Sequence, residues 1–548
     1  MIELFARNPQ RVATTMTIEY LSAPSTRLLY RRQFLMGPAP LMPYEGWNVS
    51  RLAGQYISTH PDLEVNTITK EGKDIVSIGH LIDPNEPALD NRGVLEKLVK
   101  NMVSFEDSEF QTASLGGRWV LFISIEGEAR IYPDAAGQKS VFYTKLRDTA
   151  QIWVGSQPRL LSEILRIPVD RALVDEFVSQ KFQNSWPGEI TPYPNILQLL
   201  PNHFLDVKTA RAHRFWPKGP LDAVDIRCAA TRISSILHNS ITSASRRRSL
   251  VAPLTGGYDS RVIFTCAFDI RKSIDFFTIR NPGVEHFDIS IPRKLARRMS
   301  AKYKVLKTLP ASNEFMKLQK INTSFMLSDP ADGMAFSLSQ IPDGAFVLNG
   351  SIAEVARCFY ADPESRLEQV DGQYLARVSG FDGNTIAIRS FDDWLYKAPR
   401  NLGPNILDLF YWEHRLGNWS AMVSAARDMT CDFLPPFNCR ELLETALGVA
   451  REYRLPPHKL FLKIYELTAP EVRSIPINTS FLHTTLTGLA RIVPWRIQTW
   501  VRTQRMRRVG LHRMQTDGNA IRELLRLSPC AGEPTPYQEN SQATLISG

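Results

Sequence analysis

The sequence predicts two domains of different fold class: an α+β domain of layered sheets in residues 1–218 and an α/β domain in residues 219–525. The first part carries short alternating strand patterns separated by turn residues. In the second part strands alternate with helices in the order βαβαβ, which favours a doubly wound parallel sheet with helical additions. A chain of 548 residues also exceeds what one hydrophobic core supports. Residues 526–548 are rich in Pro, Ser and Gln and predict a disordered tail.

The composition is that of an ordinary soluble globular protein, with 43% apolar and 22% charged residues. The net charge of +9 is spread along the chain, so we expect no nucleic-acid partner. The sequence has no apolar run of about 18 residues and no signal-peptide pattern, which predicts no transmembrane segment and a cytoplasmic location. Its six cysteines form no CxxC pair, which argues against zinc and against a disulfide framework.

The first domain is expected to contain at least six strands, and helices are expected at Arg92–Val103 and Pro158–Leu165. The strand segments are Thr26–Met36, Asp74–Ile82, Gly117–Gly127, Ala129–Asp134, Ser140–Lys145 and Gln151–Ser156.

The second domain is organised around a strand, a glycine-rich turn and a helix in consecutive order. Residues 251–254 form a short apolar strand, residues 255–260 (TGGYDS) a polar turn, and Arg261–Phe268 begins a helix. Two glycines without Cβ atoms let an anion approach the main chain, and the helix N-terminus adds a partial positive charge. Neither GxxxxGK[ST] nor GxGxxG fits this stretch, so it is neither a Walker loop nor a dinucleotide fingerprint. The alternative is that the glycines serve only the turn and no ligand binds. Nucleotide binding is favoured because six consecutive positions match what a phosphate-binding turn requires.

A carboxylate in a phosphate-binding turn requires a cation, because Asp259 would otherwise repel the phosphate. We therefore predict Mg²⁺ between Asp259 and a pyrophosphate. The next strand, Ile274–Ile279, is expected to flank the adenine at the switch point of the sheet. The predicted nucleotide-binding residues are Leu254, Thr255, Gly256, Gly257, Asp259, Ser260, Phe277, Thr278 and Gly350.

The other expected elements of this domain are helices and buried strands on either side of the turn. Helices are expected at Asp222–Ser245, Glu285–Val305, Asn405–Asp428 and Arg440–Arg451, and strands at Lys304–Leu309 and Ala345–Leu348. The run Arg246–Arg248 is expected to be a solvated surface turn.

The turn resembles the pyrophosphate loop (SGGxDS) of ATP pyrophosphatases, with Thr255 in place of the first serine. Its flanks are most similar to the asparagine synthetase family, which includes β-lactam synthetases and lasso-peptide cyclases. Three stretches of the first domain, Leu115–Leu121, Pro133–Tyr143 and Thr191–Val207, resemble the class II glutamine amidotransferase domain of this family, which implies Ntn-hydrolase-like layered sheets.

Those glutaminases use an N-terminal cysteine as nucleophile. Here position 2 is Ile2 and the first cysteine of the chain is Cys228. The resemblance therefore implies a degenerate amidotransferase domain without glutaminase activity.

The resemblance also implies further site residues in the second domain. Aligned on Gly350, Ala353 and Tyr360, the family's magnesium-binding acid falls on Glu354, so Asp259 and Glu354 become the expected metal ligands. A helix-start glutamate without a metal is the alternative for Glu354.

Asp432, in the segment CDFLPPF, falls on a glutamate that the family uses in amide formation. It is expected to accept the proton of the attacking amine, with a turn residue as the alternative. The family's downstream lysine would fall near Ile475, where this chain has none. Lys459, Lys463 or Arg473 is expected to supply that charge, and Lys459 and Lys463 are the predicted catalytic lysines.

The implied function is an AMP-forming carbon–nitrogen ligase that uses ATP and Mg²⁺, adenylates a substrate carboxylate and transfers the acyl group to an amine. A macrolactam cyclase acting on a peptide and a non-catalytic nucleotide-binding protein are the alternatives. The basic stretch 490–513 is expected to be a solvated helix, with a membrane surface or a partner as the other reading. A partner protein or a homodimer is left open.

Overall fold

A computed structural model describes residues 26–145, 151–180, 182, 185–280, 287–327, 331–360, 370–400, 402 and 405–477. Ile2, the basic stretch 490–513 and the tail 526–548 lie outside the described residues.

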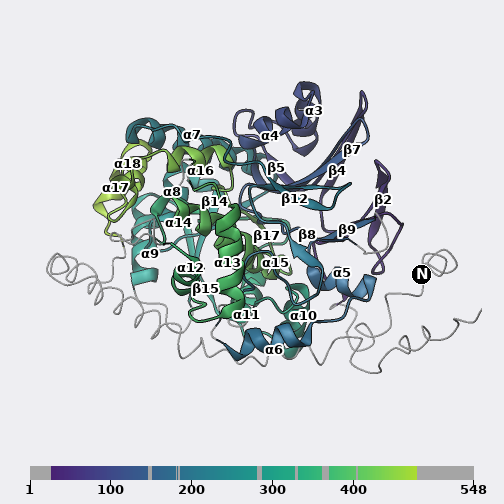
Figure 1. The fold of residues 1–548 in the computed structure, drawn as a ribbon. Coiled ribbons are helices and arrows are strands. Elements are labelled where there is room, and N and C mark those ends of the chain that lie inside the picture. Colours follow the sequence, from purple (N-terminus) through teal and green to yellow (C-terminus); the bar gives the residue numbers. More distant parts are fainter. Residues whose placement is uncertain are drawn as a thin grey trace, which may run out of the picture.

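The first domain contains two antiparallel six-stranded sheets that pack face to face (Figure 1, purple and blue). One sheet has the order β10-β8-β9-β1-β3-β2 and the other the order β12-β11-β7-β6-β5-β4. The strands are β1 Phe34–Gly37, β2 Asn48–Leu52, β3 Gln55–Thr59, β4 Val65–Lys70, β5 Lys73–Ile82, β6 Gly116–Ile125, β7 Glu128–Pro133, β8 Phe142–Lys145, β9 Ile152–Gly155, β10 Ile196–Gln198, β11 His203–Asp206 and β12 Arg211–Arg214.

The core between these sheets comes from alternate residues of facing strands, as a half-buried strand pattern requires. Phe34 and Met36 of β1 meet Val76 and Ile78 of β5 and Phe122 of β6 in one buried cluster. Helices cover the outer faces, α3 and α4 over the second sheet and α5 over the first. The helices are α3 Asn91–Asn101, α4 Phe105–Ala113, α5 Pro158–Leu165 and α6 Arg171–Ser179.

The first strand starts later than the alternating pattern predicts. Within Thr26–Met36, only the residues from Phe34 onward are extended, and residues 26–32 form turns. Tyr30 and Arg32 have φ values of 48° and 57°, which end any strand before Phe34. The other five expected strands and both expected helices are present, and the pattern did not reveal β2, β3, β4 and β10–β12.

The second domain contains a five-stranded parallel sheet with the order β15-β14-β13-β16-β17. Its strands are β13 Leu250–Pro253, β14 Ile274–Arg280, β15 Lys302–Lys307, β16 Phe346–Leu348 and β17 Asp432–Leu434. The chain moves outward from β13 to β15, then returns to place β16 on the other side of β13. The switch point of this sheet is therefore between β13 and β16, where open α/β sheets bind ligands beyond their carboxyl ends. Antiparallel sheets followed by a parallel sheet confirm the two predicted fold classes at this level.

Helices surround the parallel sheet and extend it into a helical region (Figure 1, green). Before β16 they are α7 Ile226–Arg247, α8 Asp259–Cys266, η1 Arg271–Ser273, α9 Phe287–Arg298, α10 Asn313–Asn322, α11 Ala331–Ser337 and η2 Leu338–Gln340. After it come η3 Ala353–Arg357, α12 Gly372–Ser379, α13 Thr385–Lys397, α14 Ile406–Phe410, η5 Tyr411–Ser420, α15 Ala421–Arg427, α16 Arg440–Leu447, α17 Arg451–Arg454, α18 Lys459–Thr468 and η6 Pro470–Ser474.

Four expected helices differ from the pattern. The helix expected at Arg440–Arg451 ends at Leu447, and a separate helix, α17, begins at Arg451. The helix expected at Glu285–Val305 ends at Arg298, because Ser300 adopts a φ of 53° and turns the chain into β15. The helix expected at Asn405–Asp428 is continuous but wider in its middle, where η5 has π-helical hydrogen bonding. Asp225 caps α7 by accepting from the amides of Arg227 and Cys228, so this helix starts later than expected.

The triple-arginine run is not a free surface turn, which corrects that expectation. Arg247 donates to the Leu81 and Leu89 carbonyls (2.7 and 2.6 Å), and Arg248 pairs with Asp432. Arg247 therefore fastens the end of α7 to the first domain, and Arg248 ties it to β17.

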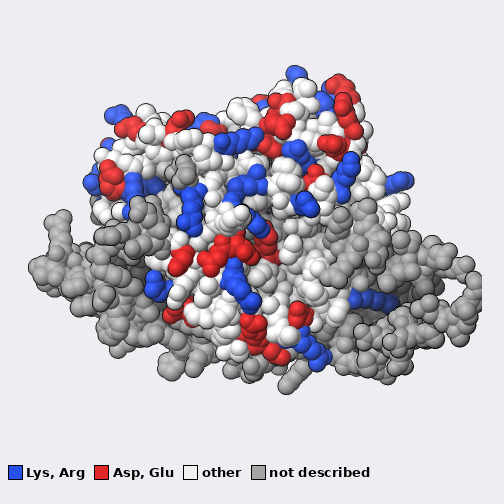
Figure 2. All heavy atoms as spheres, in the orientation of Figure 1, with Lys and Arg blue, Asp and Glu red and all other residues white. Residues whose placement is uncertain are grey.

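Charge is mixed on the face drawn in Figure 2, where basic side chains surround an acidic group near the middle. In the part of the chain that the structure describes, no helix is long and apolar enough to cross a membrane.

Candidate nucleotide-binding site

The glycine-rich turn lies at the carboxyl end of β13, directly beside the end of β14. The Leu254 amide donates to the Phe277 carbonyl (2.7 Å), and the Thr278 hydroxyl donates to the Leu254 carbonyl (2.5 Å). Phe277 packs its ring into the core, so only its backbone faces the turn. The structure thus brings Leu254, Phe277 and Thr278 together, as expected.

Hydroxyl groups close the turn on itself. The Ser260 hydroxyl accepts from the Thr255 amide (3.0 Å) and lies 2.9 Å from the Thr255 hydroxyl. The Thr255 hydroxyl in turn accepts from the Gly257 amide (3.3 Å). Helix α8 begins at Asp259 with no side-chain cap, so its first amides are left for a ligand.

Gly350 follows β16 and lies against the start of α8. A Cβ at this position would lie 2.8 Å from the Asp259 Cβ and 3.0 Å from its carbonyl carbon. Contacts that short with backbone cannot be relieved without a shift of the main chain, so only glycine fits here. The predicted Gly350 therefore sets how closely η3 approaches the turn.

Two carboxylates meet across the switch point, with an arginine between them. Asp259 comes from the start of α8 and Glu354 from η3, and these are the two residues predicted as metal ligands. Arg357 donates to the Asp259 carboxylate (2.7 Å) and lies 4.0 Å from that of Glu354. Sequence reasoning missed Arg357, and no spacing signal marks it, because its role depends on a contact between distant segments.

Both carboxylates have raised pKa values. The pKa of Asp259 is raised to about 7. Burial is the main cause, Glu354 adds to the rise, and Arg357 opposes it. Burial likewise raises the pKa of Glu354, against the effect of Arg357. Two acids brought together out of water favour a cation between them.

These residues fit a magnesium ion. Asp259 Oδ1 and Glu354 Oε2 are buried, and neither has a hydrogen-bond partner within the described residues. No group of three or more His, Cys, Asp or Glu side chains in the described ranges is placed to hold a metal. Mg²⁺ typically takes one or two carboxylates and completes its shell with water and substrate phosphates, so a pair of carboxylates is sufficient.

Helix α18 reaches the turn, though not through the lysines predicted from sequence. The Tyr465 hydroxyl donates to the Tyr258 carbonyl (2.9 Å), and the His458 ring lies 4.8 Å from the Tyr258 ring. Lys463 instead pairs with Glu466 (2.9 Å), and Lys459 lies over the Tyr453 ring. The expectation that these lysines reach the site is therefore not supported by their contacts.

The segment expected to hold the family's downstream lysine is nevertheless close to the turn. Arg261 of α8 donates to the carbonyls of Ile475 and Pro476 (2.7 and 2.8 Å). Arg473, the other cation considered from sequence, lies 3.5 Å from Glu466.

The structure does not place Asp432 at this site, which corrects the sequence prediction. Asp432 begins β17 and is in register with Phe346 and Leu250, which begin β16 and β13. The turn follows the carboxyl end of β13, whereas Asp432 lies at the amino ends of the strands. The two are therefore at opposite ends of the sheet. There Asp432 contacts His80 (2.8 Å) and Arg248 (3.0 Å).

The electrostatic environment of Asp432 also disfavours a role as a base. Burial would raise its pKa, but His80, Arg32 and Arg248 outweigh burial and hold the pKa well below its usual range. Such a carboxylate accepts a proton poorly at neutral pH.

The start of the first described strand carries no thiol. Gln33 precedes β1, is 2% exposed, and donates to the Asn322 carbonyl (3.0 Å). The whole chain has no cysteine before Cys228, which lies in α7 of the second domain.

Comparisons with known proteins return only low similarity. No family model and no curated protein matches the chain. One solved structure, glutamine phosphoribosylpyrophosphate amidotransferase from B. subtilis with ADP and GMP, is 9% identical with a TM-score of 0.23, over 61% of this chain and 72% of that chain. Another is described as the allosteric regulatory enzyme of purine biosynthesis, with 9% identity and a TM-score of 0.23, over 61% and 73%. A glutamine-dependent NAD⁺ synthetase from Acinetobacter baumannii is 12% identical with a TM-score of 0.19, over 40% and 41%. At these values the similarities assign no activity to this chain.

Proposed function

We propose that this protein is an ATP-dependent, AMP-forming amide synthetase that lacks its own glutaminase. The observation that carries the proposal is that the TGGYDS turn, which contains Asp259, lies beside Glu354 and Gly350 at the switch point of a parallel sheet. The amides at the start of α8 suit the phosphate oxygens of a metal–triphosphate, and the carboxylate pair suits its cation.

In the proposed reaction a substrate carboxylate oxygen attacks the α-phosphorus of ATP. The bond between that phosphorus and the oxygen bridging the α- and β-phosphates breaks, and pyrophosphate leaves. An amine then attacks the acyl carbon, AMP leaves, and the amine loses a proton. The turn residues Thr255–Ser260 would bind the leaving pyrophosphate through amides and hydroxyls. Mg²⁺, when bound by Asp259 and Glu354, would offset phosphate charge.

The first experiment measures Mg-ATP binding by calorimetry for the wild type, Asp259→Asn and Glu354→Gln. We expect each variant to bind at least about tenfold more weakly, because each removes a metal ligand. Asp275→Asn is the matched control, since Asp275 is the second residue of β14 and lies toward the amino end of the strand, away from the turn. Unchanged binding in both site variants would remove these carboxylates from the nucleotide site.

A second experiment tests catalysis. A panel of amino acids and dicarboxylic acids is supplied with Mg-ATP and hydroxylamine, and hydroxamate and pyrophosphate are measured. We expect stoichiometric formation of both from at least one acid, abolished in Asp259→Asn. Glutamine alone should release no glutamate above an enzyme-free control.

A non-catalytic nucleotide-binding protein is the second candidate, and Arg357 favours it. Arg357 already offsets the charge of Asp259 and Glu354 without a metal, so on this candidate the two carboxylates only hold α8 and η3 together. Tight Mg-ATP binding without pyrophosphate release from any acid of the panel would select this candidate.

A further inference from the structure

Arg357 lies inside the candidate nucleotide site, although no step of the proposed reaction uses it. Its Nη2 donates to the Asp259 carboxylate (2.7 Å), and its side chain is only 19% exposed. The Nε–H of the same guanidinium is buried and donates to no described residue. A buried charged donor without an acceptor is unfavourable, so this nitrogen indicates an acceptor that a ligand provides.

The 3₁₀ conformation of η3 explains why Arg357 faces the carboxylate pair. Residues three positions apart lie above one another in a 3₁₀ helix, so Glu354 and Arg357 point to the same side, 4.0 Å apart. The helix follows Ile352, which is buried and has a φ of 81°. Such a φ is an outlier for a β-branched residue, and strain of this kind is typical of functional sites.

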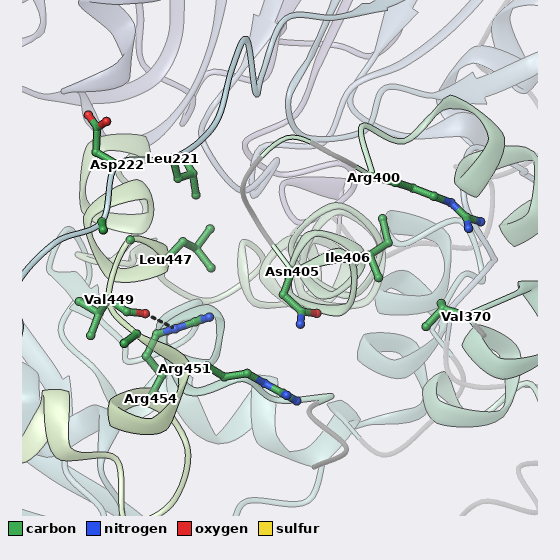
Figure 3. A pocket seen from close by; sticks show the side chains of 13 residues that line it. Leu221, Asp222, Val370, Arg400, Asn405, Ile406, Leu447, Val449, Arg451 and Arg454 are labelled. Carbon is green, nitrogen blue, oxygen red and sulfur yellow. Dashed lines mark hydrogen bonds between the residues drawn. The ribbon is translucent and has the colours of Figure 1, made fainter. Parts of the chain in front are cut away.

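Contacts on the other side of η3 hold this helix in place. Arg454 donates to the Val355 carbonyl of η3 (3.4 Å) and to the Val449 carbonyl (3.2 Å), the second of which is the dashed line in Figure 3. Asp408 accepts from the same guanidinium (2.8 Å). Arg357 therefore extends from an anchored backbone, which lowers the entropic cost of binding a ligand.

The order of the strands indicates which part of a nucleotide Arg357 would meet. β14, where the adenine is expected, lies on one side of β13, and β16 with η3 lies on the other. The glycine-rich turn follows β13 and lies between them. A nucleotide with its base over β14 and its phosphates on the turn therefore directs its phosphate end toward η3.

The other cations considered near the turn are engaged elsewhere. Arg261 donates to two backbone carbonyls, and Lys463 and Arg473 both lie beside Glu466. Arg357, by contrast, contacts Asp259 directly, at the start of α8.

We propose that Arg357 binds the pyrophosphate part of ATP, with its Nη2 on Asp259 and its Nε–H on a phosphate oxygen. A planar guanidinium carries five N–H donors in a fork, so it can donate to a carboxylate and a phosphate together. Asp259 Oδ1 and Glu354 Oε2 remain available to Mg²⁺.

The same contact assists adenylation, and this part of the inference rests on the proposed function. When the bond from the α-phosphorus breaks, its electron pair passes to the oxygen that leaves with pyrophosphate. Arg357 stabilises the charge that develops on this leaving group, and no proton is transferred. Binding of pyrophosphate itself does not depend on the reaction.

The test measures Mg-pyrophosphate binding to the full chain by calorimetry. Arg357→Gln should weaken it about tenfold or more. Arg357→Lys keeps a cation opposite Asp259 and should fold normally, but it has no planar fork and should still lose about fivefold. Arg389→Gln removes an exposed arginine paired with Glu176, and as the matched control it should bind like the wild type.

Mn²⁺ affinity in the absence of pyrophosphate distinguishes a ligand contact from structural support. It should not fall in Arg357→Gln, because that variant removes a cation that competes with the metal. A parallel loss of Mn²⁺ and Mg-pyrophosphate affinity would overturn the inference, because Arg357 would then only support the carboxylates.

Unchanged Mg-pyrophosphate affinity in Arg357→Gln would also overturn it, as would unchanged affinity in Arg357→Lys if thermal melts show Arg357→Gln to be unfolded. A wild type that binds no Mg-pyrophosphate has the same consequence. Pyrophosphate release from ATP separates the two proposals. Binding through Arg357 without release from any acid supports the contact and counts against the synthetase. Release by the wild type, with full Mg-pyrophosphate binding in Arg357→Gln, overturns the contact and leaves the synthetase standing.

Discussion

At the scale of single residues, Gly350 and Arg357 control the space around Asp259. Gly350 approaches α8 so closely that a methyl group would lie 2.8 Å from the Asp259 Cβ. We expect Gly350→Ala to displace η3 from the turn, to cost about 1–3 kcal/mol of stability and to weaken Mg-ATP binding. Calorimetry and urea unfolding measure the two effects. Gly219→Ala is the control, since a Cβ there meets nothing within 4 Å. Wild-type behaviour of Gly350→Ala would mean that the close approach is not needed.

Arg357 occupies the position of a cation between the two carboxylates. We expect Arg357→Leu to bind Mn²⁺ more tightly than the wild type in the absence of nucleotide, by about tenfold, because no internal charge then competes with the metal. Paramagnetic resonance of free Mn²⁺ measures the affinity. Arg389→Leu, which removes an exposed arginine paired with Glu176, should match the wild type. Weaker Mn²⁺ binding in Arg357→Leu would show that the arginine helps to hold the site open for metal.

At the scale of elements, the start of β17 is held against β5 by a buried contact between Asp432 and His80, flanked by the partly exposed Arg248 and Glu64. Asp432 contacts His80 and Arg248, and the other ring nitrogen of His80 lies 3.2 Å from Glu64. Removing one member of a buried ionic group costs about 3–5 kcal/mol. We expect Asp432→Asn to destabilise the chain by this amount and to lower both half-reactions together. Loss of amide formation alone, with adenylation intact, would restore the proton-accepting role predicted from sequence.

The same contacts predict a pH dependence of stability. Burial would lower the pKa of His80, but Asp432 and Glu64 outweigh burial and raise it. The contribution of His80 is therefore complete below its unfolded pKa of about 6.5 and is lost as the pH rises through its folded value. The opposite holds for Asp432, whose lowered pKa makes its contribution complete above about pH 4. Arg32 and Arg248 also face this group.

We expect the free energy of unfolding to fall between about pH 6 and about pH 9, and to fall less in His80→Gln, because only the wild type releases this proton. Urea unfolding at both pH values measures it. His238→Gln is the control, since His238 is partly exposed on α7. Equal pH slopes in the wild type and His80→Gln would contradict the assignment.

Sequence patterns predicted where many of the helices and strands lie. They could not predict contacts between segments that are distant in sequence. The strand, turn and helix around Asp259 are contiguous in sequence, so their residues could be placed together, and the resemblance added Gly350 and Glu354. Asp432 was misplaced because a short motif does not reveal which end of a strand meets the site. Arg357 was missed because its partner, Asp259, is 98 positions away.

At the scale of the whole molecule, the two sheet systems share one continuous core. A single buried cluster contains Leu98 and Phe142 of the first domain and Phe276 and Trp412 of the second. Arg118 of β6 holds both carboxylate oxygens of Asp428, with side chains only 4% and 2% exposed. The first domain therefore supports the packing of the second.

Separation of the chain at residue 218 tests this dependence. Alone, residues 219–548 would leave Asp428 and Glu413 without Arg118 and Arg214, two buried charges that each lose their partner. They would also expose the apolar surface that the first domain covers. We therefore expect this fragment to aggregate or to unfold without cooperativity. Co-expression with residues 1–218 should restore a soluble complex that binds Mg-ATP, because the same contacts form between fragments. A fragment 219–548 with the melting temperature and Mg-ATP affinity of the full chain would show that the first domain is dispensable for folding, and its retention would then have to be explained by recognition of a substrate or partner.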